Sequence, residues 1–346
     1  MGSSCTGDDK AENFKVGVKG KMLRCRHVTI AVTNDCNMQC KDCYVGQKKE
    51  YLDFDKFQNK ILKEFMEAGG KSIGFSGGEP LLYPQIFPSI RLAKQNGLET
   101  SLVTNGILLT KEKAKKLKDA GLDRIQISLD AGNSEPNDAL RQKGAFQLAV
   151  CQAVPAAIYA GLRVTLVAVP NTYLLQNLRE YLDLAERLKV HAVYFRRRID
   201  QSSGRVSKEE KQCYYGFLEE LEKRKENYRF PIYSGDPMQS LVKLKSRTDL
   251  DAKKMFAGCS AGITSLAIQP DGDVFPCTRL PVVLGNVYKE SLTDIWKESK
   301  ILQTLRMRDT EGKCGICSFK YVCGGCRAAA YFQYQNFIQE DPMCCV

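Results

Sequence analysis

The sequence predicts an α/β fold, a partial (β/α)6 TIM-like barrel followed by a smaller cysteine-rich domain. Two observations predict the barrel. Short β-branched or apolar runs alternate with amphipathic stretches, and six such units occur without a dinucleotide-binding fingerprint. A third observation predicts the second domain: eight of the 15 cysteines come after residue 258, whereas the middle of the chain carries only two.

Six strands are expected from the apolar and β-branched runs. They are His27–Thr33, Ser72–Ser76, Glu99–Thr104, Arg124–Leu129, Arg163–Val169 and His191–Arg196. Helices are expected between them at Phe54–Ala68, Lys111–Ala120, Phe146–Ala160 and Leu174–Leu188. Two of these helices end at Gly69 and Gly121, because glycine readily adopts the left-handed conformation of a helix cap.

The pattern changes after Arg198. A long, highly charged helix is expected over Lys208–Glu226, and short strands, turns and cysteines follow later in the chain. One further helix is expected over Ser291–Arg308, with Ser291 and Asp294 as a variant capping box at its start. We therefore divide the chain into a polar arm, a barrel and a cysteine-rich domain, over residues 1–24, 25–230 and 231–346.

Composition limits the classes of protein that this chain can be. Among its 346 residues no run of 18 apolar residues occurs, so no membrane span is expected, and the polar start lacks the apolar core of a secretory signal. We therefore expect a cytoplasmic protein whose thiols are metal ligands rather than disulfides. The net charge of +11 favours an anionic partner, although a solvated lysine-rich surface explains it too. No aromatic–basic stripe indicates nucleic acid.

Three cysteines stand close together in the loop after the first strand. Cys36, Cys40 and Cys43 fall within eight residues, so a single loop can turn all three sulfurs toward one point. A closed zinc or iron–sulfur site needs four protein ligands, whereas three leave one position open for catalysis. The alternative on the triplet alone is a zinc knuckle or a chance grouping.

This triplet, with Tyr44 after it, resembles the cluster motif of the radical S-adenosylmethionine (SAM) superfamily. The resemblance implies that the three cysteines hold a 4Fe–4S cluster whose fourth iron chelates the amino and carboxylate groups of SAM. It also implies the chemistry: reductive cleavage of SAM gives a 5′-deoxyadenosyl radical, which removes a hydrogen atom from the substrate.

Other motifs stand where this resemblance requires them. The segment Ser76–Pro80 is similar to the family's GGEP motif, and further polar positions follow the later strands, where barrel active sites assemble. The resemblance implies that cofactor contacts come from Tyr44, Gly77, Gly78, Glu79, Asn105, Ser128, Arg141 and Val169.

The C-terminal cysteines resemble the SPASM extension of radical SAM enzymes. That resemblance implies two auxiliary 4Fe–4S clusters, and therefore three clusters in all. By the family pattern, the cluster nearer the barrel takes Cys259, Cys277 and Cys326. The outer cluster takes Cys314, Cys317, Cys323 and Cys344. The nearer cluster then has three evident ligands, so either one iron stays open or Cys345 or an upstream cysteine completes the set. By itself, the quartet from Cys314 to Cys326 suits tetrahedral zinc equally well.

Three arginines are candidates for binding the substrate. Arg196 and Arg198 end the sixth strand, and Arg205 follows in the next turn. Guanidinium groups gathered at a barrel end suit a carboxylate or a phosphate. A solvated or acid-paired run is the other interpretation.

The resemblance implies a radical SAM/SPASM enzyme that completes a net oxidation, first of all the crosslinking or related maturation of a peptide side chain. The alternative substrate is a tetrapyrrole or another small carboxylate, altered by oxidative decarboxylation or side-chain modification. A flavodoxin- or ferredoxin-type protein would donate electrons. Only 35 residues precede Cys36, so we expect a peptide-recognition domain to be absent or encoded separately. A non-catalytic iron–sulfur electron carrier or a zinc-binding module is the hypothesis from a different class.

Overall fold

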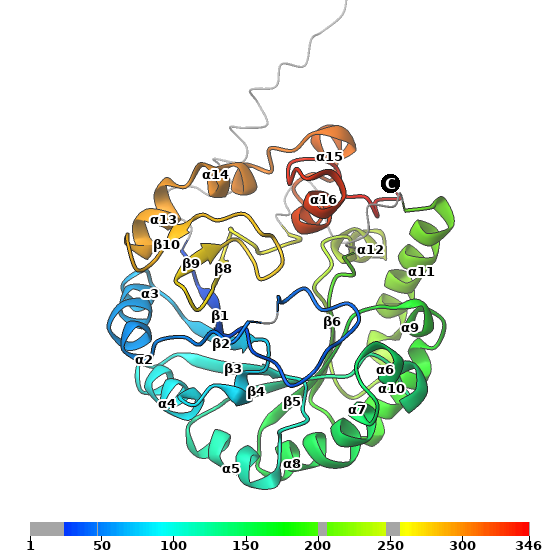
Figure 1. Cartoon of the computed structure of the whole chain (residues 1–346). Helices are drawn as coiled ribbons and strands as arrows, with labels where there is room; N and C mark the ends of the chain where they lie inside the picture. Colours follow the sequence, from blue (N-terminus) through cyan, green and yellow to red (C-terminus); the bar gives the residue numbers. More distant parts are fainter. Residues whose placement is uncertain (1–23, 47, 200–205, 247–256, 346) are drawn as a thin grey trace, which may run out of the picture.

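The computed structural model describes residues 24–46, 48–199, 206–246 and 257–345. Its centre is a ten-stranded sheet in the order β10-β9-β8-β1-β2-β3-β4-β5-β6-β7. The strands from β8 through β1 to β7 run parallel and form an arc with helices on its outer side (Figure 1). Because the end strands β10 and β7 are not neighbours in this sheet, the arc is an open, partial barrel.

All six predicted strands are present, and no end differs from the prediction by more than one residue. They are β1 (His27–Thr33), β2 (Ser72–Gly77), β3 (Glu99–Thr104), β4 (Arg124–Ser128), β5 (Arg163–Ala168) and β6 (Ala192–Phe195). Val28, Ile30 and Val32 of β1 are fully buried, and β1 is parallel to β2. The prediction of an α/β fold is therefore confirmed.

The structure gives bounds to four further short strands, three of them in the segment where short strands were expected. They are β7 (Ile232–Ser234), β8 (Ser265–Ile268), β9 (Asp273–Phe275) and β10 (Gly285–Asn286). β8 lies parallel to β1 and β7 parallel to β6, so segments from beyond residue 230 extend the arc at both edges. The sheet thus continues across the expected domain boundary at residue 230, and the division into domains stays a prediction.

The predicted helices occur, several of them interrupted. The barrel helices are α2 (Phe54–Lys56), η1 (Phe57–Leu62), α3 (Lys63–Glu67), α4 (Ile86–Gln95), α5 (Lys111–Asp119), α6 (Ser134–Leu140), α7 (Ala145–Leu148), η3 (Ala149–Ala153), α8 (Val154–Tyr159), α9 (Thr172–Gln176) and α10 (Leu178–Arg187). The segments η1 and η3 are π-helical turns inside longer helices. Gly69 and Gly121 have φ angles of +84° and +97°, which confirms the predicted left-handed caps.

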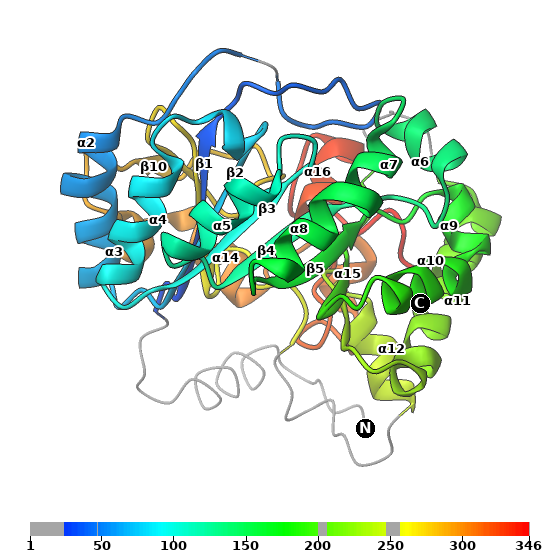
Figure 2. The same ribbon diagram turned by 90° about the horizontal axis from the view of Figure 1, so that it is seen from below.

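The later helices differ in their place: in Figure 1 the first of them continues the outer row of barrel helices on the right, and the last four lie toward the top. These helices are α11 (Lys208–Arg224), α12 (Gln239–Ser246), α13 (Leu292–Glu298), α14 (Lys300–Met307), α15 (Gly312–Ile316) and α16 (Arg327–Tyr334). In Figure 2, seen from below, α4, α5 and α8 lie in front of the strands and the C-terminal segments lie behind them. Short 3-10 turns are η2 (Pro80–Leu82) and η4 (Lys225–Asn227).

The expected single helix over Ser291–Arg308 is wrong: two helices meet at Ser299. The backbone of Ser299 is extended, with φ −60° and ψ 117°, and its hydroxyl accepts the Leu302 N–H to cap α14. The serine side chain thus competes with helix continuation. At the start of α13 the Ser291 hydroxyl accepts the Asp294 N–H, as the capping motif predicts.

The larger of two apolar clusters joins the barrel to the C-terminal segment. Phe57 and Phe75 pack edge to face, with ring centroids 6.1 Å apart, and Trp296 and Leu302 belong to the same buried cluster. Among the described helices, none combines the length and the apolar character that crossing a membrane requires.

Candidate active site

A cavity of about 630 Å³ lies at the carboxyl ends of the barrel strands. Its wall includes Gly77 at the end of β2, Asn105 after β3, Ser128 at the end of β4 and Val169 after β5. Active sites of barrel enzymes form at this end, where the loops after the strands converge. The structure thus brings these four predicted positions to one cavity.

The three N-terminal cysteines line the same cavity. Cys36 and Cys40 are half-buried and Cys43 is exposed. Burial raises the pKa of the Cys36 thiol, and Glu79 and the other two thiols raise it further. Burial also raises the pKa of Cys40, while Arg141 lowers it. The three sulfurs therefore lie in one electrostatic neighbourhood.

Two glycines let β2 approach the cysteine loop closely. A Cβ added to Gly77 would lie 2.1 Å from the carbonyl oxygen of Thr33, and one on Gly78 would lie 2.2 Å from that of Asp35. The Gly78 N–H donates to the Thr33 oxygen at 2.8 Å. Any side chain here would push the loop away from the cavity.

Glu79 is buried, and its carboxylate holds the strand ends together. Its oxygens accept hydrogen bonds from the Thr104 hydroxyl at 2.7 Å, the Asn105 N–H at 2.8 Å and the Leu81 N–H at 3.1 Å. Burial raises the pKa of this carboxyl, while the three donors lower it. Glu79 is outside the lining of the cavity, so the structure gives it a positioning role beside the predicted cofactor contacts.

Arg141 reaches the cavity from the chain after α6 and pairs with Asp130. Its Nε lies 2.7 Å from the Asp130 Oδ2, and Oδ1 of the same carboxylate accepts the Val169 N–H at 2.8 Å. Asp130 therefore links the ends of β4 and β5. Tyr44, also predicted as a contact, lines the cavity and is 38% exposed.

Two of the three predicted substrate arginines line the cavity. Arg196 and Arg198 follow β6 at its wall, whereas Arg205 lies outside the described residues. A third lining arginine, Arg279, was missed by the sequence analysis. Its position two residues after Cys277 was the only available signal.

Arg279 joins the C-terminal segment to the barrel. Its backbone N–H donates to the Cys277 sulfur at 3.4 Å, and its guanidinium donates to the carbonyl oxygen of Arg197. The same guanidinium lies 6.0 Å from the centroid of the Tyr44 ring. One residue therefore touches a predicted auxiliary ligand, the end of β6 and the cysteine loop.

The C-terminal cysteines fall into two neighbourhoods. In the first neighbourhood, burial raises the pKa of the Cys259 thiol, and the nearby Cys277 thiol raises it further. Burial likewise raises the pKa of Cys277, and Cys326 raises it further. Burial raises the pKa of Cys326 to about 11, and Cys259 is among the groups that raise it further. These three sulfurs are the predicted nearer set.

The second neighbourhood contains Cys314 and Cys323, since the Cys314 thiol adds to the increase in the pKa of Cys323 that burial causes. The Cys317 sulfur accepts the Phe319 N–H at 3.4 Å. Burial raises the pKa of Cys345, which Lys245 of α12 lowers and Glu219 of α11 raises. Cys345 therefore faces α11 and α12.

Comparisons with known proteins agree with this geometry. Residues 30–189 match the model of the radical SAM superfamily, and residues 259–326 match that of SPASM, an iron–sulfur cluster-binding domain. The chain is 30% identical over 339 residues to an AdoMet-dependent heme synthase of Methanosarcina barkeri, covering 92% of this chain and 96% of that protein.

The chain belongs to the radical SAM superfamily.

Two further proteins extend the comparison. The chain is 28% identical to the mycofactocin maturase MftC of Mycobacterium tuberculosis, covering 96% of this chain and 85% of that protein. Its fold matches Streptococcus suis SuiB, solved with its precursor peptide SuiA, at a TM-score of 0.74 and 16% identity over 100% of this chain and 83% of SuiB. This chain is thus a radical SAM enzyme with a SPASM domain, and its family supports SAM and 4Fe–4S clusters as cofactors.

The thiols of this radical SAM enzyme fit that cofactor set. Within the described residues no three thiol, imidazole or carboxylate groups converge on a single metal position. Zinc needs all its ligands within about 2.3 Å of one ion, whereas the cysteines of a 4Fe–4S cluster coordinate a larger, multi-iron group. Three thiols at one cavity leave one coordination position open, and the further thiols lie in or next to the segment that matches the iron–sulfur cluster-binding domain, so the residues present fit that cofactor set.

Proposed function

We propose that this enzyme removes a hydrogen atom from a carboxylate-bearing substrate and completes its net oxidation, with a tetrapyrrole side chain as the substrate class. The resemblance to a heme synthase supports a tetrapyrrole. The three arginines at the wall of the cavity, Arg196, Arg198 and Arg279, support a carboxylate.

These arginines are the observation that carries the choice of a carboxylate-bearing substrate. No carboxylate oxygen of the described residues lies within 4.0 Å of a guanidinium nitrogen of any of the three. Arg141, which lines the same cavity, is instead paired with Asp130. A guanidinium that has no carboxylate partner among the described residues is left to pair with a ligand anion, so these three arginines favour a substrate carboxylate.

We assign three roles to the residues in and around the cavity: holding the cluster, contacting the cofactor and orienting the substrate. Cys36, Cys40 and Cys43 would hold the SAM cluster, and Tyr44, Gly77, Gly78, Asn105, Ser128, Arg141 and Val169 would contact the cofactor. When bound, the cluster and SAM supply the radical chemistry that breaks an unreactive C–H bond. The arginines orient the substrate carboxylate, and Glu79 and Asp130 keep the strand ends in register.

A peptide is the second candidate substrate. The relative named as a mycofactocin maturase supports it, and Arg196, Arg198 and Arg279 would suit a peptide's terminal or side-chain carboxylate. The arginines alone therefore favour a carboxylate without choosing between a tetrapyrrole and a peptide.

The remaining parts of the proposal concern the cofactors and partners. We assign three clusters, with Cys259, Cys277 and Cys326 in the nearer auxiliary set. The outer set is Cys314, Cys317, Cys323 and Cys344, since Cys345 faces α11 and α12. The barrel over residues 25–230 and the SPASM-like domain over 231–346 would work in the cytoplasm, with electrons from a flavodoxin- or ferredoxin-type protein.

Deuterium transfer tests the substrate class. The anaerobically reconstituted enzyme receives SAM, dithionite and either a tetrapyrrole deuterated in its propionate chains or a deuterated carboxylate-bearing peptide. If only the deuterated tetrapyrrole transfers deuterium to 5′-deoxyadenosine, the first candidate is supported. If only the deuterated peptide does so, the second candidate is supported. SAM cleavage without transfer from either compound contradicts both, and a Cys40→Ala variant controls for cofactor-independent exchange.

A further inference from the structure

Two adjacent glycines lie between Cys323 and Cys326 in the C-terminal segment. Both are left-handed, with φ angles of +71° at Gly324 and +62° at Gly325. Consecutive left-handed residues are unfavourable for any residue with a Cβ, so the chain turns here because both positions are glycine.

The turn makes room for two buried guanidinium groups. A Cβ on Gly324 would lie 1.5 Å from Nη1 of Arg308, and a Cβ on Gly325 would lie 2.3 Å from Nη2 of Arg327. Arg308 and Arg327 are only 4% and 8% exposed. No side chain larger than hydrogen fits beside either guanidinium. The two buried arginines can therefore pack here only because both positions are glycine.

Arg327 lies against the sulfur of a predicted cluster ligand. Its Nη2 is 3.7 Å from the Cys314 Sγ, and its Nη1 donates to the carbonyl oxygens of Phe337, at 3.1 Å, and Gln339. The Cys314 sulfur also accepts the Asp341 N–H at 3.4 Å. Two donors therefore converge on this sulfur.

The charge of Arg327 is not neutralised by the carboxylates of the described residues. None of their oxygens lies within 4.0 Å of its nitrogens, whereas the equally buried Arg197 has two carboxylate partners, Asp236 and Asp341. The groups that Arg327 meets are neutral carbonyls and a thiol. Thiolates of a cluster are then the anions nearest to it.

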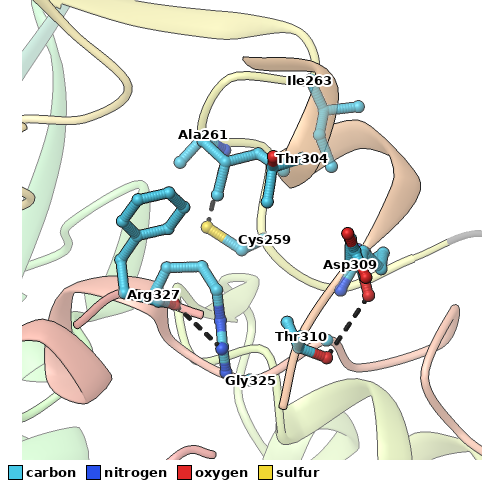
Figure 3. A pocket seen from close by; sticks show the side chains of 12 residues that line it. Cys259, Ala261, Ile263, Thr304, Asp309, Thr310, Gly325 and Arg327 are labelled. Carbon is cyan, nitrogen blue, oxygen red and sulfur yellow. Dashed lines mark hydrogen bonds between the residues drawn. The ribbon is translucent and has the colours of Figure 1, made fainter. Parts of the chain in front are cut away.

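The charge of Arg327 also acts on Cys259, in the first group of C-terminal cysteines. Burial raises the pKa of the Cys259 thiol, and Arg308 and Arg327 both lower it. Figure 3 shows Cys259 and Arg327 facing one pocket beside Gly325. Arg327 thus lies between the two groups of cysteines proposed to hold the auxiliary clusters.

We propose that Arg327, seated by Gly324 and Gly325, is a positioning and charge-supplying residue that raises the reduction potential of the auxiliary cluster held by Cys314. Reduction adds a negative charge to a cluster, and a nearby buried cation and hydrogen bonds to the sulfurs stabilise that added charge. A cluster with a higher potential is a better one-electron acceptor, as a net oxidation requires. The inference rests on the auxiliary clusters of the proposed function, but not on the identity of the substrate.

Redox titration followed by electron paramagnetic resonance tests this inference in the full-length protein. A Cys36→Ala, Cys40→Ala, Cys43→Ala background removes the SAM cluster, so the remaining signals come from the auxiliary clusters. Arg327→Gln removes the charge and Arg327→Lys keeps it. Arg306→Gln is the matched control, because Arg306 is a partly buried arginine that stacks on Trp296 at 4.1 Å in the same domain.

At the midpoint potential of the parent, we expect the ratio of reduced to oxidised Cys314 cluster to fall about tenfold in Arg327→Gln, a shift of about 59 mV. The Lys variant and the control should stay within about threefold of the parent, by the same relation. An unchanged midpoint in an iron-replete Gln variant overturns the inference, as does an equal shift in the Lys variant.

If the Gln variant loses iron, the Lys variant decides, because it retains the charge. A tenfold change in its ratio of reduced to oxidised cluster contradicts the inference. A midpoint potential near that of the parent supports it. Iron content separates this test from the proposed function. A parent background without about eight irons, two clusters of four, would refute the auxiliary clusters themselves.

Discussion

Arg197, two residues after the end of β6, forms a buried ion pair with Asp341, 144 residues later in the chain. The side chains of Arg197 and Asp341 are 3% and 2% exposed. The second oxygen of Asp341 accepts the N–H of the predicted ligand Cys326 at 2.7 Å. This carboxylate therefore ties the barrel, beside the arginine-lined cavity, to the cysteines of the C-terminal segment.

Replacing Asp341 with asparagine should destabilise the fold strongly. The change leaves Arg197 with Asp236 as its remaining carboxylate partner, and breaking a buried pair costs about 3 kcal/mol or more. Urea unfolding of the metal-free chain measures the loss. Glu99→Gln, which removes an exposed pair with Arg124, should change the free energy of unfolding by about 0–1 kcal/mol. Equal effects of the two substitutions would contradict a structural role for the buried pair.

Gly77→Ala should prevent assembly at the N-terminal cysteines. The added Cβ would meet the Thr33 carbonyl at 2.1 Å, at a φ of +130°, and push the cysteine loop outward. Iron analysis after reconstitution should show a loss of about four irons, one cluster. Gly46→Ala is the matched control from the same loop, because no atom lies within 4 Å of its added Cβ. Full iron content in Gly77→Ala would show that the loop tolerates displacement.

Arg279→Gln should weaken the use of substrate. Loss of a charge-assisted hydrogen bond to a carboxylate costs about 1.5–3 kcal/mol, which corresponds to roughly a ten- to hundredfold fall in kcat/KM. Arg163→Gln should leave kcat/KM unchanged, since Arg163 is an exposed residue at the opposite end of β5. A normal kcat/KM in Arg279→Gln with full iron content would remove Arg279 from the substrate site.

His27 should make the stability of the metal-free chain sensitive to acid. Burial lowers the pKa of this histidine below 6.5, and Arg124 lowers it further. The unfolded chain therefore binds a proton more readily, so stability is complete above about pH 6.5 and is lost as pH falls toward the lowered value. Urea unfolding from pH 8 to pH 5 should show a smaller decrease for His27→Gln than for wild type. Parallel curves would mean that His27 titrates equally in both states.

The sequence predicted the parts of the molecule that local patterns determine. Strands such as Arg163–Ala168 repeat apolar residues over several positions, and Gly69 and Gly121 are the residue type that left-handed caps require. The cysteine loop was found because its ligands are adjacent in the chain. Each of these signals lies within about fifteen residues.

The sequence could not predict contacts that depend on the closing of the sheet. β8 has only four residues, and it pairs with β1, which begins 238 positions earlier. No local periodicity in the sequence could therefore predict this pairing. Arg279 reaches Tyr44 only because this pairing carries the C-terminal segment over the cavity. The break at Ser299 was hidden because apolar spacing continues from Trp296 to Leu302 while a single hydroxyl ends the helix.

Reductive cleavage of SAM is the decisive assay for the cavity that Cys36, Cys40 and Cys43 line. The anaerobically reconstituted protein with dithionite should convert SAM to 5′-deoxyadenosine. Alanine at Cys36, Cys40 or Cys43 should abolish this conversion while the C-terminal iron remains. Cleavage that persists in these variants, or a reconstituted wild-type protein that binds iron but leaves SAM intact, would contradict the assignment of this cavity as a radical SAM site.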